Sequence, residues 1–292
     1  MGAAPKLGGC LHCPPFPLFL PLNKLMTNQQ IKTGIFGGSG FYDFLDKPRE
    51  ITIKTPFGAP SDKITIGECQ GKKIAFLPRH GKKHQYPPHQ IPYLANLWAF
   101  KKIGVERIIA PCAVGSLKPK IKPGDFVIPD QFFNFTKKRE DTFFNGPKTA
   151  HISSADPYCQ DLRNLAVKVS KKLKIPTHSK GTIIVIEGPR FSSRAESKYF
   201  SSLADVINMT AYPEIVLAKE LEMCYINIAL ITDYDVGLKN KKSVKPVSAQ
   251  EVVKIFKENN EKVKKMIFEI IELMPEKRNC PCQNALKNAL IN

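Results

Sequence analysis

The most constraining feature of the sequence is an alternation of short apolar runs with helical patterns. The runs are rich in β-branched residues, which predicts strands buried on both faces, at residues 33–36, 73–77, 107–110, 126–128, 182–186 and 225–231. Helical patterns lie between some of these runs, at residues 93–102, after the N-cap pair Asp156-Pro157, and at residues 214–223. This alternation predicts a single α/β domain over roughly residues 30–275.

The last predicted helix has the clearest start signal. Ser248 and Glu251 have the spacing of a capping box, in which each side chain satisfies an exposed backbone N–H group of the other residue. Beyond them, apolar residues repeat at helical spacing and leave Lys and Glu on the opposite face: Val252, Phe256, Val263, Ile267, Ile270 and Met274. We therefore expect an amphipathic helix that packs on the sheet.

The two ends of the chain differ from this pattern. Residues 1–25 contain five prolines and no acidic residue, so we expect a disordered extension before a domain at residues 26–292. No apolar run approaches the ~20 residues that a membrane-spanning helix needs, which predicts no membrane partner. The apolar stretch at residues 18–25 is broken by Pro21 and makes a poor signal peptide, so we expect a cytoplasmic protein with reduced thiols.

The formal net charge of the 292 residues is +18, from 44 Lys and Arg against 26 Asp and Glu. Such a charge is compatible with nucleic acid, with an anionic small substrate, or with a Lys-rich surface. The basic residues are spread along the chain, including a predicted loop at residues 239–245, and no nucleic-acid-binding motif is present. We therefore expect no nucleic-acid partner.

Eight cysteines are scattered along the chain, which is not the pattern of a small disulfide framework. Two close pairs, Cys10 with Cys13 and Cys280 with Cys282, would supply four thiolates to zinc only if the two termini met. The favoured alternatives for the C-terminal pair are free thiols or a small local disulfide. We expect no metal site.

Two predicted strands end in residues suited to an anion. Gly37-Gly38-Ser39-Gly40 follows the first strand and offers backbone N–H groups and a hydroxyl, although an ordinary tight turn is an equal alternative. Arg79 and His80 follow the second strand, and an Arg guanidinium suits phosphate. A solvated charge run, or a metal site formed by His80, His84 and His89, are the alternatives. Residues 113–116 close another strand and could add backbone donors.

Two further strand ends carry groups suited to a planar ligand. Phe191 could stack on such a ligand, although a core position is the commoner role of a lone Phe. Asp233 and Asp235 follow the last strand on one face, and two carboxylates in a closed pocket repel, so that one tends to keep a proton. Such a pair complements adenine, whose 6-amino group donates while N7 accepts. Two solvated acids remain the alternative.

In combination, these segments resemble the purine nucleoside phosphorylase superfamily, trimeric class, over about residues 31–290. The matching motifs occur in order: Gly-Gly-Ser-Gly at 37–40, Thr-Pro-Phe-Gly at 55–58, Arg-His-Gly at 79–81, Ala-Asn-Leu-Trp-Ala at 95–99, Val-Gly-Ser-Leu at 114–117, Pro-Gly-Asp-Phe-Val-Ile at 123–128, Glu-Gly-Pro-Arg-Phe-Ser-Ser-Arg-Ala-Glu-Ser at 187–197, Asn-Met-Thr at 208–210 and Thr-Asp-Tyr-Asp at 232–235. The resemblance implies a nucleoside phosphorylase fold with a central mixed twisted sheet flanked by helices.

The resemblance also implies roles for single residues. It implies a phosphate site built from Ser39, Arg79, His80, Cys112, Ala113 and Thr210. Cys112 stands where a small polar residue is usual, so its backbone is the better candidate. For the nucleoside, it implies Met209 under the ribose, Phe191, Tyr234, Asp233 and Asp235 at the base, and His151 lent by a neighbouring subunit to the 5′ pocket. Ser192 and Ala249 are expected to set specificity.

The implied reaction is phosphorolysis of 5′-methylthioadenosine to adenine and 5-methylthioribose 1-phosphate, with Asp233 and Asp235 as catalytic residues. It belongs to purine and methionine salvage, needs no cofactor, and is expected of a homo-oligomer, a trimer or a dimer of trimers. A broader adenosine/inosine phosphorylase or a methylthioinosine phosphorylase is the alternative, and a nucleic-acid-binding protein is a more distant one.

The resemblance extends to the cysteines. Thermophilic members with a similar C-terminus carry a Cys-x-Cys pair like Cys280 and Cys282. A disulfide there, and a second one between Cys159 and Cys224, are hypotheses, with reduced thiols as the alternative.

Overall fold

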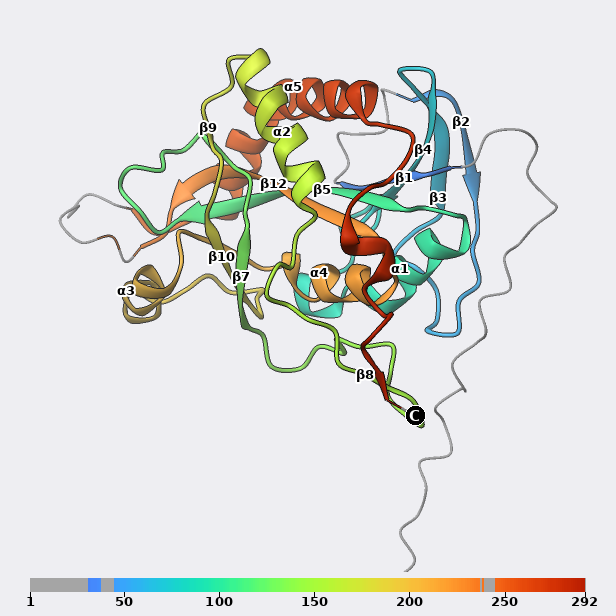
Figure 1. The fold of residues 1–292 in the computed structure, drawn as a ribbon. Coiled ribbons are helices and arrows are strands. Elements are labelled where there is room, and N and C mark those ends of the chain that lie inside the picture. Colours follow the sequence, from blue (N-terminus) through green and yellow to red (C-terminus); the bar gives the residue numbers. More distant parts are fainter. Residues whose placement is uncertain (1–30, 38–44, 237, 239–244, 292) are drawn as a thin grey trace, which may run out of the picture.

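The computed structural model describes residues 31–37, 45–236, 238 and 245–291. Most of its strands join one eleven-stranded mixed sheet in the order β2-β3-β4-β1-β5-β11-β10-β7, with β12 beside β5, then β6 and β9 (Figure 1). The strands of this sheet are β1 Thr33–Gly37, β2 Asp46–Ile51, β3 Ile64–Cys69, β4 Lys72–Pro78, β5 Arg107–Ser116, β6 Phe126–Val127, β7 Gln131–Phe135, β9 Thr177–His178, β10 Thr182–Ile186, β11 Val206–Asn208 and β12 Cys224–Tyr234. A separate two-stranded sheet pairs β8 (Thr149–Ala150) with β13 (Leu290–Ile291).

Helices cover both faces of the large sheet, as its apolar strands require. One face packs against α2 (Gln160–Lys172) and α5 (Ala249–Leu273), and the other against α1 (Tyr93–Lys102) and α4 (Ala211–Glu220) (Figure 1). A third helix, α3 (Arg194–Leu203), packs with β10 and β11 through a smaller apolar cluster. Short 3-10 turns lie at Pro88–Gln90 and Pro281–Asn284. No helix in the described part of the chain is long and apolar enough to cross a membrane.

The predicted fold class, an α/β domain with a central mixed sheet flanked by helices, is confirmed. The strand at Thr182–Ile186 and the helix at Tyr93–Lys102 have the predicted bounds. At α5, Ser248 caps the helix, since its hydroxyl accepts a hydrogen bond from the Glu251 N–H at 3.2 Å. The Glu251 carboxylate contacts the Ser248 hydroxyl at 3.5 Å, so only half of the predicted capping box forms.

One predicted helix start is wrong, and one predicted helix end is too late. The second helix begins at Gln160 with Cys159 as N-cap, three residues after the predicted Asp156-Pro157 start, because Cys159 is held at the sheet by its N–H bond to the Tyr225 carbonyl. The helix predicted at residues 214–223 lies in α4, Ala211–Glu220, where Tyr212 has non-helical backbone angles (φ −104°, ψ 134°). The regular helix therefore starts after Tyr212, close to the predicted start, and it ends at Glu220 instead of residue 223. The predicted disordered extension at residues 1–25, the domain start at 26 and most of the basic loop at 239–245 lie outside the described residues.

Candidate active site

The site is organised by a gap along one edge of β5. On that edge β1 pairs with Arg107–Ile109 and β11 pairs with Gly115 and Ser116, so the intervening residues have no strand neighbour there. Two side chains reach into the gap instead: an Arg79 N–H donates to the Pro111 carbonyl at 3.2 Å, and Asn208 Nδ2 donates to the Ala113 carbonyl at 3.0 Å. Because the N–H and C=O of a strand residue point to the same edge, the Ala113 N–H also faces the gap.

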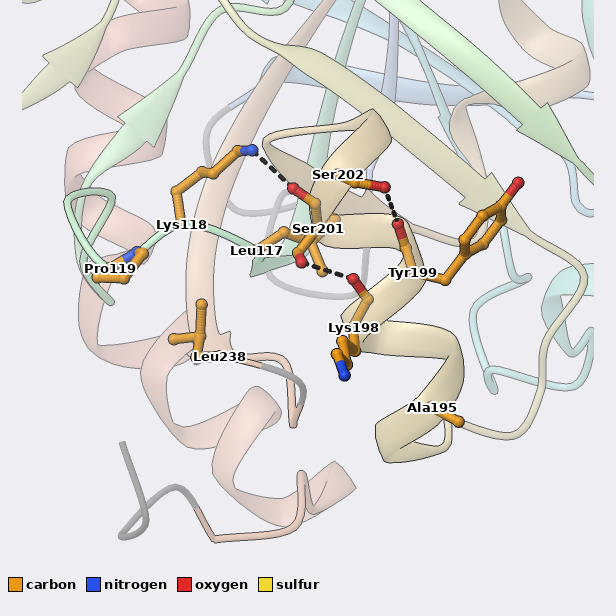
Figure 2. Close-up of a pocket in the computed structure, with 9 residues that line it drawn as sticks. All are labelled: Leu117, Lys118, Pro119, Ala195, Lys198, Tyr199, Ser201, Ser202 and Leu238. Carbon is orange, nitrogen blue, oxygen red and sulfur yellow. Dashed lines mark hydrogen bonds between the residues drawn. The ribbon is translucent and has the colours of Figure 1, made fainter. Parts of the chain in front are cut away.

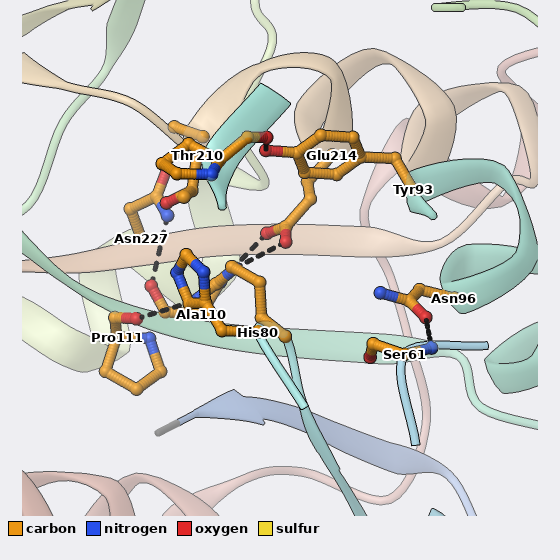
Figure 3. Close-up of polar contacts among 12 residues, drawn as sticks. Ser61, His80, Tyr93, Asn96, Ala110, Pro111, Thr210, Glu214 and Asn227 are labelled. Carbon is orange, nitrogen blue, oxygen red and sulfur yellow. Dashed lines mark hydrogen bonds and ion pairs between the residues drawn. The ribbon is translucent and has the colours of Figure 1, made fainter. Parts of the chain in front are cut away.

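Arg79 directly follows β4 and is almost completely buried. Its guanidinium forms a bidentate ion pair with Glu214 of α4, with N···O distances of 2.6 and 2.9 Å. Glu214 is labelled in Figure 3, where dashed lines mark the contacts of its carboxylate. Burial alone would lower the pKa of Arg79, but the attraction of the Glu214 carboxylate outweighs it and raises the pKa. Glu214 also accepts a hydrogen bond from the Tyr225 hydroxyl at 2.7 Å. The cation is therefore permanent and fixed in direction.

Arg79 still has donors for a ligand. A guanidinium carries five N–H groups, and the bonds to Glu214 and Pro111 use three of them among the described residues. The other two can bind a phosphate oxygen pair. Next to Arg79, the His80 ring nitrogen Nδ1 lies 2.8 Å from the Tyr86 carbonyl, so it is the protonated nitrogen. Burial lowers the pKa of His80 to about 4, which keeps the ring neutral before a ligand binds.

Thr210 is the N-cap residue of α4 and is buried. Asn208 arranges this helix start, because its Oδ1 accepts from the backbone N–H groups of Thr210 at 2.6 Å and Ala211 at 2.7 Å. The same side chain bonds to Ala113, so Asn208 ties the helix start to the gap in β5. A helix N-terminus favours an anion, and here it lies close to the Arg79 side of the sheet.

Asp233 and Asp235 lie together at the end of β12, beside the last residues of β5. A Cβ atom added to Gly115 would lie 3.0 Å from Asp233 Oδ1 and 3.6 Å from the Asp235 Cβ, so both acids pack over this glycine. The register of β12 shifts between Ile231 and Asp233, which is the signature of a β-bulge. Asp233 and Asp235 are two residues apart and therefore share one face of the extended chain, and Gly115 leaves room for both of them.

Both carboxyl groups hold their protons more strongly than usual. Burial raises the pKa of Asp233 to about 6, partly opposed by a hydrogen bond from the Thr232 hydroxyl at 2.7 Å. Burial also raises the pKa of Asp235, partly opposed by the hydroxyl of Ser197. Near neutral pH the pair can therefore donate one proton and accept one hydrogen bond. Among the described residues, the buried Ser192 Oγ and Asp235 Oδ2 have no hydrogen-bond partner.

Other predicted residues reach the same region from β10 and β11. Gly188, just after β10, has a positive φ of 69°, and an added Cβ would meet the Met209 sulfur at 2.8 Å. This close approach brings the segment before the exposed Phe191 against Met209. Tyr234 turns the other way from the aspartates and its hydroxyl reaches the Pro119 carbonyl at 3.4 Å.

Four predicted residues contribute less to the assembled geometry. Ser39 lies outside the described residues. His151 follows β8, which pairs with β13 near the C-terminal end rather than with the strands of the site (Figure 1). Ala249 is exposed in the first turn of α5. Cys112 is buried in the core, burial raises the pKa of its thiol to about 12, and its backbone faces β12 rather than the gap.

Two surface hollows are lined by other residues. One lies between residues 117–119, helix α3 and Leu238 (Figure 2), and the second is lined by residues 89–95 and 138–140 with Phe57. Neither contains a residue predicted to bind phosphate or nucleoside, and the second includes His89 of the alternative metal site. The predicted metal alternative is not supported: His80 and His84 stack with ring centroids 4.4 Å apart, and in the described part of the chain the one cluster of metal-binding side chains consists of cysteines.

Sequence reasoning missed the two residues that fix the anion side. Glu214 directly precedes the apolar segment Ile215–Ala218 of α4 and is fully buried, but its place in the sequence does not identify Arg79 as its partner. Asn208 was noted only as part of a motif. Both act through residues far away in sequence, so neither role follows from local pattern alone.

The site and fold together define a phosphorylase. The sequence profile of the Phosphorylase superfamily matches residues 32–272, and the chain belongs to this superfamily. Within it, the chain is 54% identical to the S-methyl-5′-thioadenosine phosphorylase of Pyrococcus furiosus over 260 residues, which cover 89% of this chain and 99% of the relative. The corresponding protein of Saccharolobus solfataricus is 51% identical over 271 residues, or 90% and 98% of the two chains.

Solved structures give the same result. A methylthioadenosine phosphorylase from an antarctic soil metagenomic library has a TM-score of 0.84 and 38% identity, covering 90% of this chain and 93% of that one. A variant adenosine/methylthioadenosine phosphorylase of Schistosoma mansoni, solved with methylthioadenosine, has a TM-score of 0.80 and 33% identity, covering 88% and 96%.

Proposed function

We propose that this chain is an enzyme that cleaves 5′-methylthioadenosine with phosphate, giving adenine and 5-methylthioribose 1-phosphate. The observation that carries this proposal is the pair of carboxyls at the end of β12, that of Asp235 buried and that of Asp233 half-buried, set across β5 from a buried, permanently charged Arg79. One side of the site suits a phosphate and the other suits a 6-aminopurine. The relatives named above support the methylthio nucleoside as substrate.

The anion side acts on the nucleophile. Phosphate binds to the two remaining N–H groups of Arg79, to the Ala113 N–H and at the Thr210 end of α4, with the Ser39 hydroxyl as a further donor. A negatively charged phosphate accepts a hydrogen bond from His80 once that ring takes up a second proton, which the neighbouring anion favours. This set holds the phosphate below the ribose, where its charge stabilises the positive charge that grows as the glycosidic bond loosens.

The acid side acts on the leaving group. The bond between C1′ and the purine nitrogen breaks, a phosphate oxygen bonds to C1′, and the departing adenine needs a proton at N7. A protonated carboxyl of the Asp233 and Asp235 pair donates it, while the second carboxyl accepts from the 6-amino group. A 6-oxopurine presents an acceptor at that position, so it would face a carboxylate unfavourably. Phe191 and Met209 pack on the base and the ribose.

The remaining parts of the proposal concern the setting of the reaction. We propose that no metal or organic cofactor takes part in catalysis. The enzyme acts in the cytoplasm as a trimer or a dimer of trimers, in which His151 completes the 5′ pocket of a neighbouring subunit. The position of His151 beside β13, away from the strand ends, supports this role. Ser192 and Ala249 shape the preference for the base and the 5′ substituent.

The deciding assay measures purine release from methylthioadenosine, adenosine, inosine and methylthioinosine, each with and without phosphate. We expect phosphate-dependent adenine release that is fastest with methylthioadenosine. Release without phosphate would indicate a hydrolase instead. Faster turnover of inosine or methylthioinosine would favour the broader phosphorylases, and no turnover of any nucleoside would contradict the proposal.

The role of Asp233 has its own test. Asp233→Asn removes the acid while keeping the size of the side chain, so we expect kcat/KM for methylthioadenosine to fall about 100-fold or more. The 6-oxopurine nucleosides should lose much less, because an amide can donate to their oxygen. Equal losses for both substrate classes would make Asp233 a structural residue.

A further inference from the structure

Four cysteines that the phosphorylase reaction does not use come together on the opposite side of the core from Arg79. They are Cys159, Cys224, Cys280 and Cys282, and their sulfur atoms all lie within 4.8 Å of one another. The first three are buried and Cys282 is half-buried. In the described residues all four are free thiols, and the Cys224 and Cys280 sulfurs approach to 3.2 Å. Neither of the two hypothesised disulfides, Cys159 with Cys224 and Cys280 with Cys282, is formed in the structure, which instead brings all four cysteines into one cluster.

We propose that this cluster binds one zinc ion through four thiolates. Zinc prefers four ligands in a tetrahedron with Zn–S bonds of about 2.3 Å, which puts the sulfurs about 3.8 Å apart. The observed separations, between 3.2 Å for one pair and at most 4.8 Å, bracket that value. Side-chain adjustments of about 1 Å would therefore complete the tetrahedron, with the backbone in place.

The charges around the cluster suit thiolates. Cys159 is the N-cap of α2, where the helix dipole favours a negative charge. Lys219 lies close enough to Cys282 for Coulombic attraction, which offsets part of the negative charge of a zinc tetrathiolate. Binding replaces the remaining thiol protons by the metal, so it releases protons and needs no oxidant.

The ligands come from three separate segments, which gives the metal a structural role. Cys159 starts α2, Cys224 starts β12, and the other two lie in the segment after α5. That segment is otherwise fastened by polar bonds, such as Arg278 to the Glu222 carbonyl at 2.8 Å. A zinc ion would lock the C-terminal segment onto the sheet. All four protein ligands fill the coordination shell, so the site has no open position for catalysis.

The test measures metal content in the full-length protein purified under reducing conditions with Zn²⁺ present. We expect about one zinc per chain after extensive dialysis. Cys282→Ser changes the least buried ligand, so it should reduce zinc to background and lower Tm. Cys69→Ser is the matched control, because Cys69 is buried in the same protein but lies outside the cluster, and it should keep its zinc.

A second measurement covers the case in which Cys282→Ser does not fold. Titration of the zinc-free wild-type protein with Co²⁺ should give the visible absorption of a tetrahedral thiolate site, saturating at one equivalent and displaced by Zn²⁺. No such spectrum, or full zinc content in Cys282→Ser, would overturn the proposal. So would disulfides among the four cysteines in reduced, zinc-supplemented protein, or iron in place of zinc. Metal content is independent of turnover, so failure here leaves the phosphorylase proposal intact.

Discussion

The two sides of the active site both bury charged groups, but they treat them in opposite ways. On the phosphate side, Arg79 and Glu214 are buried as a bidentate pair, so each charge compensates the other and both stay ionised. On the base side, Asp233 and Asp235 receive only hydroxyl and backbone donors, and no ion pair in the described part of the chain includes either acid. Burial with a partner fixes a charge and its direction, whereas burial without one changes its protonation.

The largest expected effect on stability comes from removing the Glu214 carboxylate, which compensates the buried charge of Arg79. In Glu214→Gln the Arg79 cation stays buried without its counter-ion, which should cost about 3 kcal/mol of unfolding free energy and raise the KM for phosphate strongly. Glu220→Gln is the matched control on the same helix, because Glu220 is also buried but bonds to the neutral donors Phe143 N–H and Thr142 hydroxyl. It should cost about 1 kcal/mol. Denaturant unfolding and steady-state kinetics with varied phosphate measure these effects for both variants. Equal losses of unfolding free energy in Glu214→Gln and Glu220→Gln would contradict the special role of the ion pair.

A smaller effect, on catalysis, is expected from adding a side chain at Gly115, against which Asp233 and Asp235 pack. Gly115→Ala places a Cβ 3.0 Å from both Asp233 Oδ1 and Ile207 Cγ2, so the carboxyl must shift by a few tenths of an ångström. We expect kcat/KM for methylthioadenosine to fall about 10- to 100-fold, with the KM for phosphate nearly unchanged. Steady-state kinetics with each substrate varied in turn separates the two parameters. A loss confined to phosphate binding would mean that the two sides are not independent.

The smallest expected effect is an increase in stability, in the variant Asp233→Asn. The folded protein binds the Asp233 proton up to pH about 6, above the usual range of an Asp in an unfolded chain, so the wild type loses stability as the pH rises from about 4 to about 6. Asp233→Asn has no charge to bury. It should therefore be more stable than the wild type by about 1–3 kcal/mol above pH 6, with the difference vanishing below pH 4. Urea unfolding across this pH range tests it, and a destabilised variant at pH 8 would contradict it.

The local sequence pattern was sufficient to predict secondary structure where a segment is itself apolar and therefore buried. The run at Thr182–Ile186 is apolar and β-branched, and the structure has a strand with those bounds. In contrast, β2 was missed because all but one of its residues are exposed, so it has no apolar signal and forms only through pairing with β3. The helix α3 was not predicted, although the spacing of Ser193 and Glu196 is that of a capping box, which the structure forms.

The candidate site shows the same division. Its residues could be named from short motifs, and the structure brings Arg79, Thr210, Asp233 and Asp235 to the two sides of one gap in β5. The partner that makes Arg79 a fixed cation could not be named, because Glu214 lies 135 residues away and nothing local marks the contact. The four cysteines were expected as two separate pairs, and their union in one cluster could not be predicted, since it joins residues from three distant segments.

The long pairing of β12 with β5 also has a consequence for how the protein is made. Arg107 lies opposite Cys224, and Ser116 lies opposite Tyr234. During translation, β5 is therefore synthesised more than 100 residues before the strand with which it pairs. Until then β1 and β4 can assemble with β5 on one edge, while its other edge presents unpaired backbone groups that invite association with other chains. Nascent chains that end before residue 224 should therefore need protection by a chaperone, and they have no acid for the leaving group. Catalytic ability appears only in the last stage of synthesis.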